Sequence, residues 1–314
     1  MKPLVYIDGG AGTTGLEIRG RLADRDDIAI RLLSDADRKD ISARSRALNE
    51  AQIAILCLPD DAAREAVALI ENPAVRILDA STAHRTAPGW VYGFPELEQN
   101  RRAEIAAARG VSNPGCYATG FLALVRPLVR AGVIPPNFPI TANAMSGYSG
   151  GGRAMIEEFE HSNSQRFTSS VVRTYALNLA HKHVPEMQKH AGLAHPPVFA
   201  PTVGRFYRGM IVEVPLQLWA LPNDPTAGDL HKVLASDYAG FPLIEVAPFG
   251  ETSTTLDVEL LKNTDRMKLV VFGNDATRQA RLVAVLDNLG KGAAGAAVQN
   301  LNVMLGVSET TGLR

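Results

Sequence analysis

The chain has 314 residues, 46% of them hydrophobic and 21% charged, and its formal net charge is -1. This length allows two domains with a sizeable core, and the absence of like-charge blocks argues against nucleic-acid or membrane partners. With two cysteines, no signal peptide and no apolar run of about 18 residues, we expect a cytoplasmic protein without a disulfide framework.

Strand and helix patterns alternate in the first third of the chain, which favours a doubly wound parallel sheet. The expected strands are residues 4–8, 28–33, 53–58 and 75–80, and the expected helices are 13–23, 60–70 and 96–109. The third strand is wholly apolar, so we expect it to be buried on both faces. The predicted fold class is α/β, with a Rossmann-type sheet.

After residue 115 the pattern changes, and longer strand-like segments predict a second α/β domain with a mixed or antiparallel sheet. The segments that favour strands are 198–218, 243–248, 255–261 and 267–272, and those that favour helices are 116–130, 184–191, 229–238 and 277–289. A loop over 290–297 and a helix over 298–305 are expected to return to the first domain. We therefore expect one domain of 1–115 with 290–314, and another of 116–289.

A glycine-rich turn follows the first strand and opens the first helix. Gly9, Gly12 and Gly15 form a G-x-x-G-x-x-G variant of the dinucleotide fingerprint. Glycine permits the tight turn and lets backbone N–H groups approach a pyrophosphate, which the helix N-terminus favours electrostatically. The alternative is a sharp turn without a ligand. The other residues placed at this cofactor site are Thr13, Thr14, Pro59 and Ser81.

The loop after the second strand bears on which nicotinamide cofactor binds. Ser34, Arg38 and Lys39 can bind a ribose 2′-phosphate, whereas an acidic residue here, Asp35 or Asp37, would favour a free hydroxyl. On these residues alone, a charged surface loop is an equal alternative. We expect NADP.

Cys116 follows a Pro-Gly turn and stands at the predicted start of an apolar helix. Orphan backbone N–H groups and the helix dipole favour its thiolate, and the same donors can hold an oxyanion. The other cysteine, Cys57, lies in an apolar strand and is interpreted as a small buried residue. Cys116 is therefore the candidate nucleophile.

A thiol nucleophile usually needs a base, and His181 and His183 flank Lys182. Alternate residues of this kind can face opposite ways, so one histidine can be structural, or the triplet can lie on the surface. Two histidines at this spacing can also bind zinc, but no third ligand is suitably spaced, and we predict no metal.

Six motifs together resemble those of the N-acetyl-gamma-glutamyl-phosphate reductase family, over nearly the whole chain. They are Gly-Gly-Ala-Gly-Thr-Thr-Gly at 9–15, Asp-Ala-Ser-Thr-Ala-His-Arg at 79–85, Tyr-Gly-Phe-Pro-Glu-Leu at 92–97, Ser-Asn-Pro-Gly-Cys-Tyr-Ala-Thr at 112–119, Ser-Gly-Tyr-Ser-Gly-Gly-Gly-Arg at 146–153 and His-Lys-His-Val-Pro-Glu at 181–186. Lys182 replaces an arginine found in many members. This difference and the chain length resemble the short subclass.

The resemblance implies an aspartate-semialdehyde-dehydrogenase-like architecture, NADP(H) as cofactor, a cytoplasmic location and a homodimer or homotetramer. It implies arginine biosynthesis, with Cys116 as nucleophile and His181 as acid and base. The residues expected to bind the substrate are Asn113, Arg85, Ser149, Tyr175 and His183.

The expected reaction converts an acyl phosphate to an aldehyde through a thioester, with NADPH as hydride donor. Arginine suits the phosphate and carboxylate of such a substrate, and Arg85 is favoured for the phosphate over Arg153, Arg205 and Arg208. One rival is a reductase of aspartyl phosphate or of a carrier-linked aminoadipyl phosphate. Another is a nucleotide-binding sensor or scaffold without catalysis.

Overall fold

The computed structural model describes residues 2–250 and 253–314, and the chain divides into two compact units. Unit 1 comprises residues 1–114 and 293–313, and unit 2 comprises 115–292 together with the terminal Arg314. The last helix of the chain therefore belongs to the same unit as the N-terminal residues.

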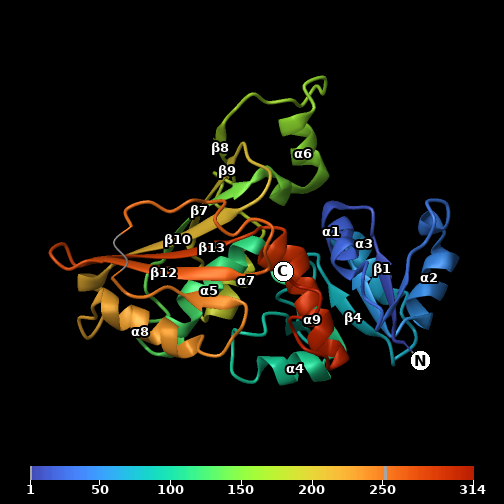
Figure 1. The fold of residues 1–314 in the computed structure, drawn as a ribbon, viewed down its shortest axis with the longest axis horizontal. Coiled ribbons are helices and arrows are strands. Elements are labelled where there is room, and N and C mark those ends of the chain that lie inside the picture. Colours follow the sequence, from blue (N-terminus) through green and yellow to red (C-terminus); the bar gives the residue numbers. More distant parts are fainter. Residues whose placement is uncertain (1, 251–252) are drawn as a thin grey trace. The chain divides into compact units, whose positions relative to one another are not determined.

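Unit 1 is built on a parallel sheet of order β2-β1-β3-β4-β6-β5 (Figure 1). Its strands are β1 (Leu4–Asp8), β2 (Ala29–Arg31), β3 (Ile53–Leu56), β4 (Arg76–Asp79), β5 (Val91–Tyr92) and β6 (Gly110–Ser112). All four residues of β3 are buried, as predicted for a strand covered on both faces. The expected α/β class and parallel sheet are confirmed.

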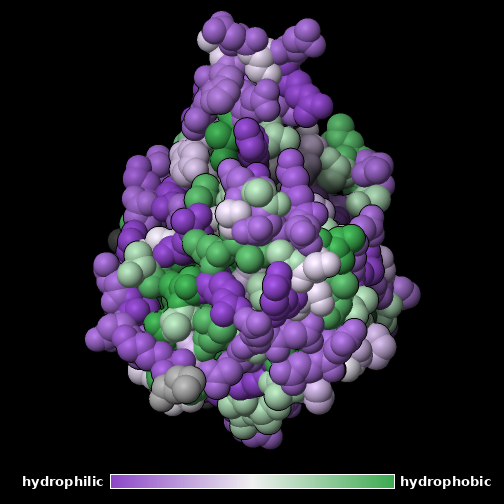
Figure 2. Space-filling view, turned by 90° about the vertical axis from the view of Figure 1, so that its right-hand side faces the viewer, coloured by the Kyte–Doolittle hydropathy of each residue, from purple (hydrophilic) through white to green (hydrophobic). Residues whose placement is uncertain are grey.

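Helices complete unit 1, and the parallel order brings the carboxyl ends of its strands to one edge. They are α1 (Thr13–Leu22), α2 (Ile41–Glu50), α3 (Asp60–Ala68), α4 (Arg101–Ala107) and α9 (Gly295–Leu305). One apolar cluster joins β1 and β3 to α1 and α9, through residues such as Val5, Ile18 and Leu301. A second cluster includes Leu48 of α2 and Leu56 of β3. The side of the molecule that carries α2 in Figure 1 faces the viewer in Figure 2, where hydrophilic residues are interspersed with separate groups of apolar ones.

Unit 2 contains a mixed sheet of order β11-β12-β13-β10-β7-β9-β8. Its strands are β7 (Thr141–Gly147), β8 (Val172–Thr174), β9 (Val198–Gly204), β10 (Met210–Gln217), β11 (Ile244–Val246), β12 (Met267–Asn274) and β13 (Gln279–Leu286). Strand β10 is antiparallel to both β13 and β7, whereas β7 and β9 are parallel. The mixed second sheet predicted from the sequence is confirmed.

The helices of unit 2 are α5 (Cys116–Arg130), α6 (Gly152–Glu160), α7 (Val184–Ala191) and α8 (Ala227–Asp237). Helix α5 packs against β10, β13, α7 and α8, and it is buried over most of its length. In Figure 1, α5, α7 and α8 lie on one side of the sheet. The predicted bounds of α5 and α7 are confirmed.

Three predicted elements are wrong. The expected helix 277–289 is mostly strand β13, whose inner half is buried on both faces and therefore lacks the alternation that identifies a strand. Residues 255–261 form coil and turns, although their Leu256 and Leu261 still pack on the core cluster of the sheet. The expected loop 290–297 is a π-helical turn, Gly290–Ala294, that runs directly into α9.

Candidate functional site

The glycine turn of unit 1 joins β1 to α1. Gly9 has a φ of +80°, and a Cβ there would overlap the carbonyl oxygen of Cys57, so only glycine fits without rearrangement. A Cβ on Gly15 would lie 2.6 Å from the Gly9 oxygen. Gly12 is the N-cap of α1 and offers no side-chain cap, and Thr13 and Thr14 form the first helical turn. The backbone donors at this helix end are therefore arranged as an anion site requires.

A cavity of about 170 Å³ lies beside this turn and is lined by Gly9, Gly10 and residues of the two following elements. Arg38, predicted at this site, lines it together with Asp35, and Arg38 Nε lies 3.3 Å from the Asp35 carboxylate. Arg19 of α1 lines the same cavity, and its NH1 donates to the Gly10 carbonyl at 3.3 Å. The sequence pattern does not identify Arg19, because a charged residue at this position of a helix indicates only that the side chain is exposed to solvent.

One residue that lines this cavity, Asp8, belongs to a buried ion pair. The Asp8 carboxylate, at the end of β1, accepts from Arg44 NH2 at 2.9 Å, and both residues are buried. Burial, followed by the charge of Asp8, raises the pKa of the Tyr6 phenol well above its usual value. The pair fixes the strand end from which the glycine turn departs.

The remaining predicted cofactor residues lie at several places in unit 1. Ser34 donates to Asp37 at 2.7 Å, and both it and Lys39 are exposed outside the lining of the cavity. Pro59 is the N-cap of α3, three residues after the last residue of β3. Ser81 follows β4, so both residues lie along the edge to which Gly9 belongs.

Ser81 belongs to a buried network after β4. Its hydroxyl donates to Asp79 Oδ2 at 2.7 Å, and His84 Nδ1 lies 2.7 Å from the same oxygen. The His84 ring stacks on Trp90 with centroids 4.0 Å apart. This network fixes the segment that leads to Arg85.

Two predicted substrate residues, Arg85 and Asn113, are buried in unit 1. Arg85 Nε donates to the Asn113 carbonyl at 2.9 Å. The Asn113 side chain donates to the Ala293 carbonyl at 3.0 Å and accepts from Asn300 at 3.0 Å. The segment between the end of β6 and Cys116 is therefore fixed by these side-chain hydrogen bonds.

Cys116 is the first residue of α5 and is a partly exposed cysteine that forms no disulfide; its helix has Gly115 as N-cap and no side-chain cap. The Gly115 N–H donates to Glu186 Oε2 at 3.1 Å. A Cβ on Gly292 would lie 2.8 Å from the Cys116 Cβ, so the glycine lets the π-helical turn pass close to this cysteine. The other thiol differs, because burial raises the pKa of Cys57 to about 12.

Two phenols lie beside Cys116. Tyr175, a predicted substrate residue, donates its hydroxyl to that of Tyr117 at 3.0 Å. Burial raises the pKa of Tyr175 to about 12 and that of Tyr117 well above its usual value, and a Cys116 thiolate raises both further. Both phenols therefore remain protonated donors in neutral solution.

The two predicted histidines lie against the same aromatic cluster. The His181 and His183 rings are 4.7 Å apart, and His181 meets the Tyr117 ring at 5.6 Å. The backbone N–H of His183 donates to His181 Nδ1 at 3.1 Å. A neutral His181 ring accepting at Nδ1 carries its proton on Nε2, so that nitrogen is a donor. His183 is buried, with its Nε2 3.9 Å from Glu186 Oε1.

Ser149, also predicted to bind substrate, is buried, and its hydroxyl accepts from Asn288 Nδ2 at 2.9 Å. Arg205 donates to the backbone carbonyls of Phe159, Thr168 and Ser170. Its guanidinium therefore holds a chain segment, and it is not retained as a substrate candidate.

Among residues 2–250 and 253–314, no group of three or more metal-binding side chains is found. The same residues include no helix with the length and hydropathy needed to cross a membrane.

Two family profiles match the chain. The profile described as the NAD binding domain of semialdehyde dehydrogenase matches residues 5–106. The one described as the semialdehyde dehydrogenase dimerisation domain matches residues 116–288. The chain is also 53% identical over 320 residues to N-acetyl-gamma-glutamyl-phosphate reductase 2 of Nostoc sp., covering 99% of both chains. It is 53% identical to N-acetyl-gamma-glutamyl-phosphate reductase of Burkholderia ambifaria, covering 98% of this chain and 97% of that protein.

Solved structures share the fold at low identity. Aspartate semialdehyde dehydrogenase II of Vibrio cholerae, complexed with ASA, superimposes with a TM-score of 0.76 at 17% identity, covering 97% of this chain and 98% of that one. Aspartate semialdehyde dehydrogenase of Candida albicans with NADP gives a TM-score of 0.64 at 12% identity, with coverage of 97% and 99%. These likenesses establish the fold alone.

Proposed function

The chain belongs to the N-acetyl-gamma-glutamyl-phosphate reductases of the semialdehyde dehydrogenase family, and we propose that Cys116 carries their reaction here. The reaction is the NADPH-dependent reduction of N-acetylglutamyl 5-phosphate to N-acetylglutamate 5-semialdehyde and phosphate, a cytoplasmic step of arginine biosynthesis. The observation that carries the proposal is the partly exposed Cys116 thiol at an uncapped helix N-terminus.

Residues of unit 1 fit a nicotinamide cofactor, because the tight turn that Gly9 and Gly15 permit leads into α1, whose N-terminal N–H groups have no side-chain cap and suit a pyrophosphate. The residues proposed to hold the cofactor are Gly9, Gly12, Thr13, Thr14, Gly15, Ser34, Arg38, Lys39, Pro59 and Ser81. When bound, the cofactor supplies the hydride that reduces the acyl group. Unit 1 is thus the proposed NADP-binding domain, and unit 2 the catalytic and oligomerisation domain.

The Cys116 thiolate attacks the acyl carbon, the bond to phosphate breaks, and a thioester forms on the sulfur. The N-terminus of α5 stabilises the thiolate electrostatically. After reduction, the thiohemiacetal releases the aldehyde and restores the thiol. The covalent step divides a difficult reduction into two easier ones.

His181 is proposed to donate from Nε2 to the oxyanion that develops on the acyl oxygen. The bond from the His183 N–H to Nδ1 supports this role, since it favours a proton on the other nitrogen. This is the acid half of the role expected from the sequence. The remaining residues proposed to bind the substrate are Asn113, Arg85, Ser149, Tyr175 and His183.

The preference for NADP over NAD is proposed to rest on Arg38, supported by Arg19. Both guanidiniums line one cavity beside the glycine turn, and Arg38 already holds an anionic partner, Asp35. A ribose 2′-phosphate, which can carry two negative charges, can take the place of the Asp35 carboxylate beside Arg38. We expect Arg38→Ala to weaken NADPH binding strongly and NADH binding little, measured by fluorescence titration. Equal losses for both cofactors would contradict the assignment.

The reaction is tested in reverse, by NADP⁺ reduction with N-acetylglutamate semialdehyde and phosphate. Wild type should be active and Cys116→Ser nearly inactive, with unchanged cofactor binding. A folded, cofactor-binding wild type without activity would exclude this substrate and direct the assay to aspartate and aminoadipate semialdehydes.

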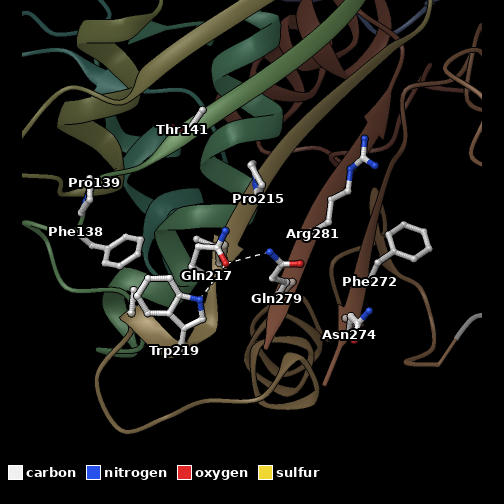
Figure 3. A pocket seen from close by; sticks show the side chains of 14 residues that line it. Phe138, Pro139, Thr141, Pro215, Gln217, Trp219, Phe272, Asn274, Gln279 and Arg281 are labelled. Atoms are coloured by element: carbon white, nitrogen blue, oxygen red, sulfur yellow. Dashed lines mark hydrogen bonds between the residues drawn. The ribbon is translucent and has the colours of Figure 1, made fainter. Parts of the chain in front are cut away.

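We propose a homo-oligomer in which a second copy covers the open sheet face of unit 2. This face has a groove of about 700 Å³, flanked by Phe138 and Trp219 on one side and Phe272 on the other (Figure 3). Trp219 is 62% exposed, and its Nε1 donates to Gln217 at 3.2 Å. The match of this unit to a dimerisation domain supports a copy of the chain as occupant. Light scattering of Trp219→Arg should show a smaller species than wild type, and an unchanged mass would remove this face from the interface.

A further inference from the structure

Tyr117 is a buried phenol that directly follows Cys116 in α5 and has no role in the reaction proposed above. It is 4% exposed, and its ring meets those of His181, His183 and Phe199 at centroid distances of 5.6, 5.8 and 5.2 Å. These three rings fix the position of the phenol. A phenylalanine would fill the same space without a buried hydroxyl that needs a hydrogen-bond partner. The hydroxyl, rather than the ring, is therefore the feature that requires an explanation.

The hydroxyl of Tyr117 accepts a hydrogen bond from the hydroxyl of Tyr175 at 3.0 Å. A phenol has a single O–H to donate, and its oxygen also accepts. Burial raises the pKa of both phenols, so both keep their protons in neutral solution. Because Tyr175 gives its proton to Tyr117, its oxygen can act toward a third group only as an acceptor. The direction in which Tyr175 bonds is thus set by Tyr117.

The position of Tyr175 beside the proposed site is also well fixed. Its ring meets that of His181 at 5.7 Å, and a Cys116 thiolate raises its pKa, so both groups are near. The next residue, Ala176, has a φ of +53°, which is uncommon for a residue with a Cβ and persists only where surrounding contacts hold it. The Tyr175 N–H donates to the Pro201 carbonyl at 3.3 Å. The phenol oxygen is therefore held at a defined place near Cys116.

We propose that Tyr117 is a positioning residue for substrate selection, which fixes Tyr175 as an acceptor for the acetamido N–H of the substrate. The inference rests on the proposed function, and in particular on the substrate role of Tyr175. At neutral pH the semialdehyde carries a carboxylate, an aldehyde and an amide, so its one hydrogen-bond donor is the amide N–H. The acyl phosphate shares this N–H. An oxygen that can only accept therefore matches this group of the substrate.

The test compares N-acetylglutamate semialdehyde with its ester analogue, in which oxygen replaces the amide N–H and the shape is kept. The assay is NADP⁺ reduction in the presence of phosphate, and the quantity measured is the ratio of kcat/KM for the amide to that for the ester. Tyr117→Phe keeps the ring but removes the acceptor of the Tyr175 proton, whereas Tyr175→Phe removes the proposed acceptor of the N–H. The matched control is Tyr238→Phe, since Tyr238 is a buried phenol that donates to the Ala123 carbonyl farther along α5 at 2.9 Å.

We expect wild type and Tyr238→Phe to prefer the amide by about tenfold, the scale of one hydrogen bond to an otherwise unpaired group. The difference should lie in KM, because the N–H is not at the reacting carbon and its bond is made equally in the ground state and the transition state. Tyr175→Phe should show no preference. In Tyr117→Phe the Tyr175 proton is free to turn toward the substrate, where it suits the ester oxygen better than the N–H, so the ratio should fall toward that of Tyr175→Phe.

A wild-type ratio in folded Tyr117→Phe would overturn the proposal, and so would a wild type without preference for the amide. If Tyr117→Phe fails to fold, Tyr175→Phe decides, because a wild-type ratio there would mean that Tyr175 does not accept the N–H. A wild type inactive with both compounds would reject the substrate and this inference together. An active wild type whose ratio is unchanged in both variants would reject the inference alone.

Discussion

The two units each present a helix that begins after a glycine without a side-chain cap, yet they use it differently. In unit 1, α1 starts after Gly12, and the cavity beside it is lined by the glycine turn and by charged residues such as Arg19 and Arg38. In unit 2, α5 starts at Cys116, and side chains from other elements surround it, with Glu186 holding the preceding N–H. The same kind of helix end is therefore proposed to serve as an anion site in one unit and as a support for a thiolate in the other.

This comparison predicts that a change at either site should leave the other working. The largest effect is expected from His181→Ala, which removes the proposed oxyanion donor of unit 2. Its kcat should fall by about 10²–10⁴-fold, the range for loss of a positioned proton-transfer or donor group. NADPH affinity, measured by fluorescence titration, should match wild type. A large loss of cofactor affinity would show that the sites are not independent.

The converse change is Gly9→Ala in unit 1. The new Cβ would overlap the Cys57 carbonyl and require a positive φ, so the turn must rearrange. NADPH binding should weaken by about 10²-fold, comparable to a misplacement of 1 Å at a reacting centre. The pH at which iodoacetamide alkylation of Cys116 is half-maximal, followed by mass spectrometry, should remain at its wild-type value. Wild-type cofactor affinity in this variant would remove the turn from the binding site.

The next largest effect is expected from breaking the buried ion pair between Asp8 and Arg44. Arg44→Met leaves the Asp8 carboxylate buried without this partner, which costs about 3–5 kcal/mol in comparable pairs. Urea unfolding should show a loss of that size, whereas Arg64→Ala, at an exposed pair with Asp61, should cost about 1 kcal/mol or less. Equal losses in the two variants would mean that the buried pair has no special role.

Whether a residue of either site can be predicted from the sequence depends on how far apart in the chain the contacting residues lie. The glycine turn and the start of α5 are local patterns, so Gly9, Gly12 and Cys116 could be identified directly. Glu186 bonds to Gly115, which lies far along the chain, and Arg19 reaches Gly10 and the cavity only once the turn has folded, so only the structure reveals them.

The incorrect prediction of a helix at strand β13 has a related cause. Its central place in the sheet, between β12 and β10, buries both faces over its inner half, and the resulting apolar run also fits a helix. The neighbours that decide between the two are long-range partners, which periodicity does not report.

Alkaline pH should act on unit 1 through Cys57. Its folded pKa of about 12 exceeds the unfolded value of about 8.5, so the folded state binds the proton more tightly. The associated stability is complete below pH 8.5 and is lost as pH rises toward 12, by up to about 1.4 kcal/mol per pH unit. Between pH 9 and 10, below the unfolded pKa of tyrosine, urea unfolding of Cys57→Ala should therefore decline less than that of wild type. Parallel curves would exclude Cys57 as the source.

The smallest effect should come from Gly20, which shares α1 with Gly15 but has no part in the turn. It is exposed in the helix interior, and a Cβ there meets nothing within 4 Å. Gly20→Ala should therefore stabilise the protein by about 0.5–1 kcal/mol, because alanine loses less backbone entropy on folding. Its NADPH affinity should be unchanged in fluorescence titration. A weakened affinity would mean that α1 responds to substitution anywhere along its length, and the loss in Gly9→Ala would then no longer locate the cofactor at the turn.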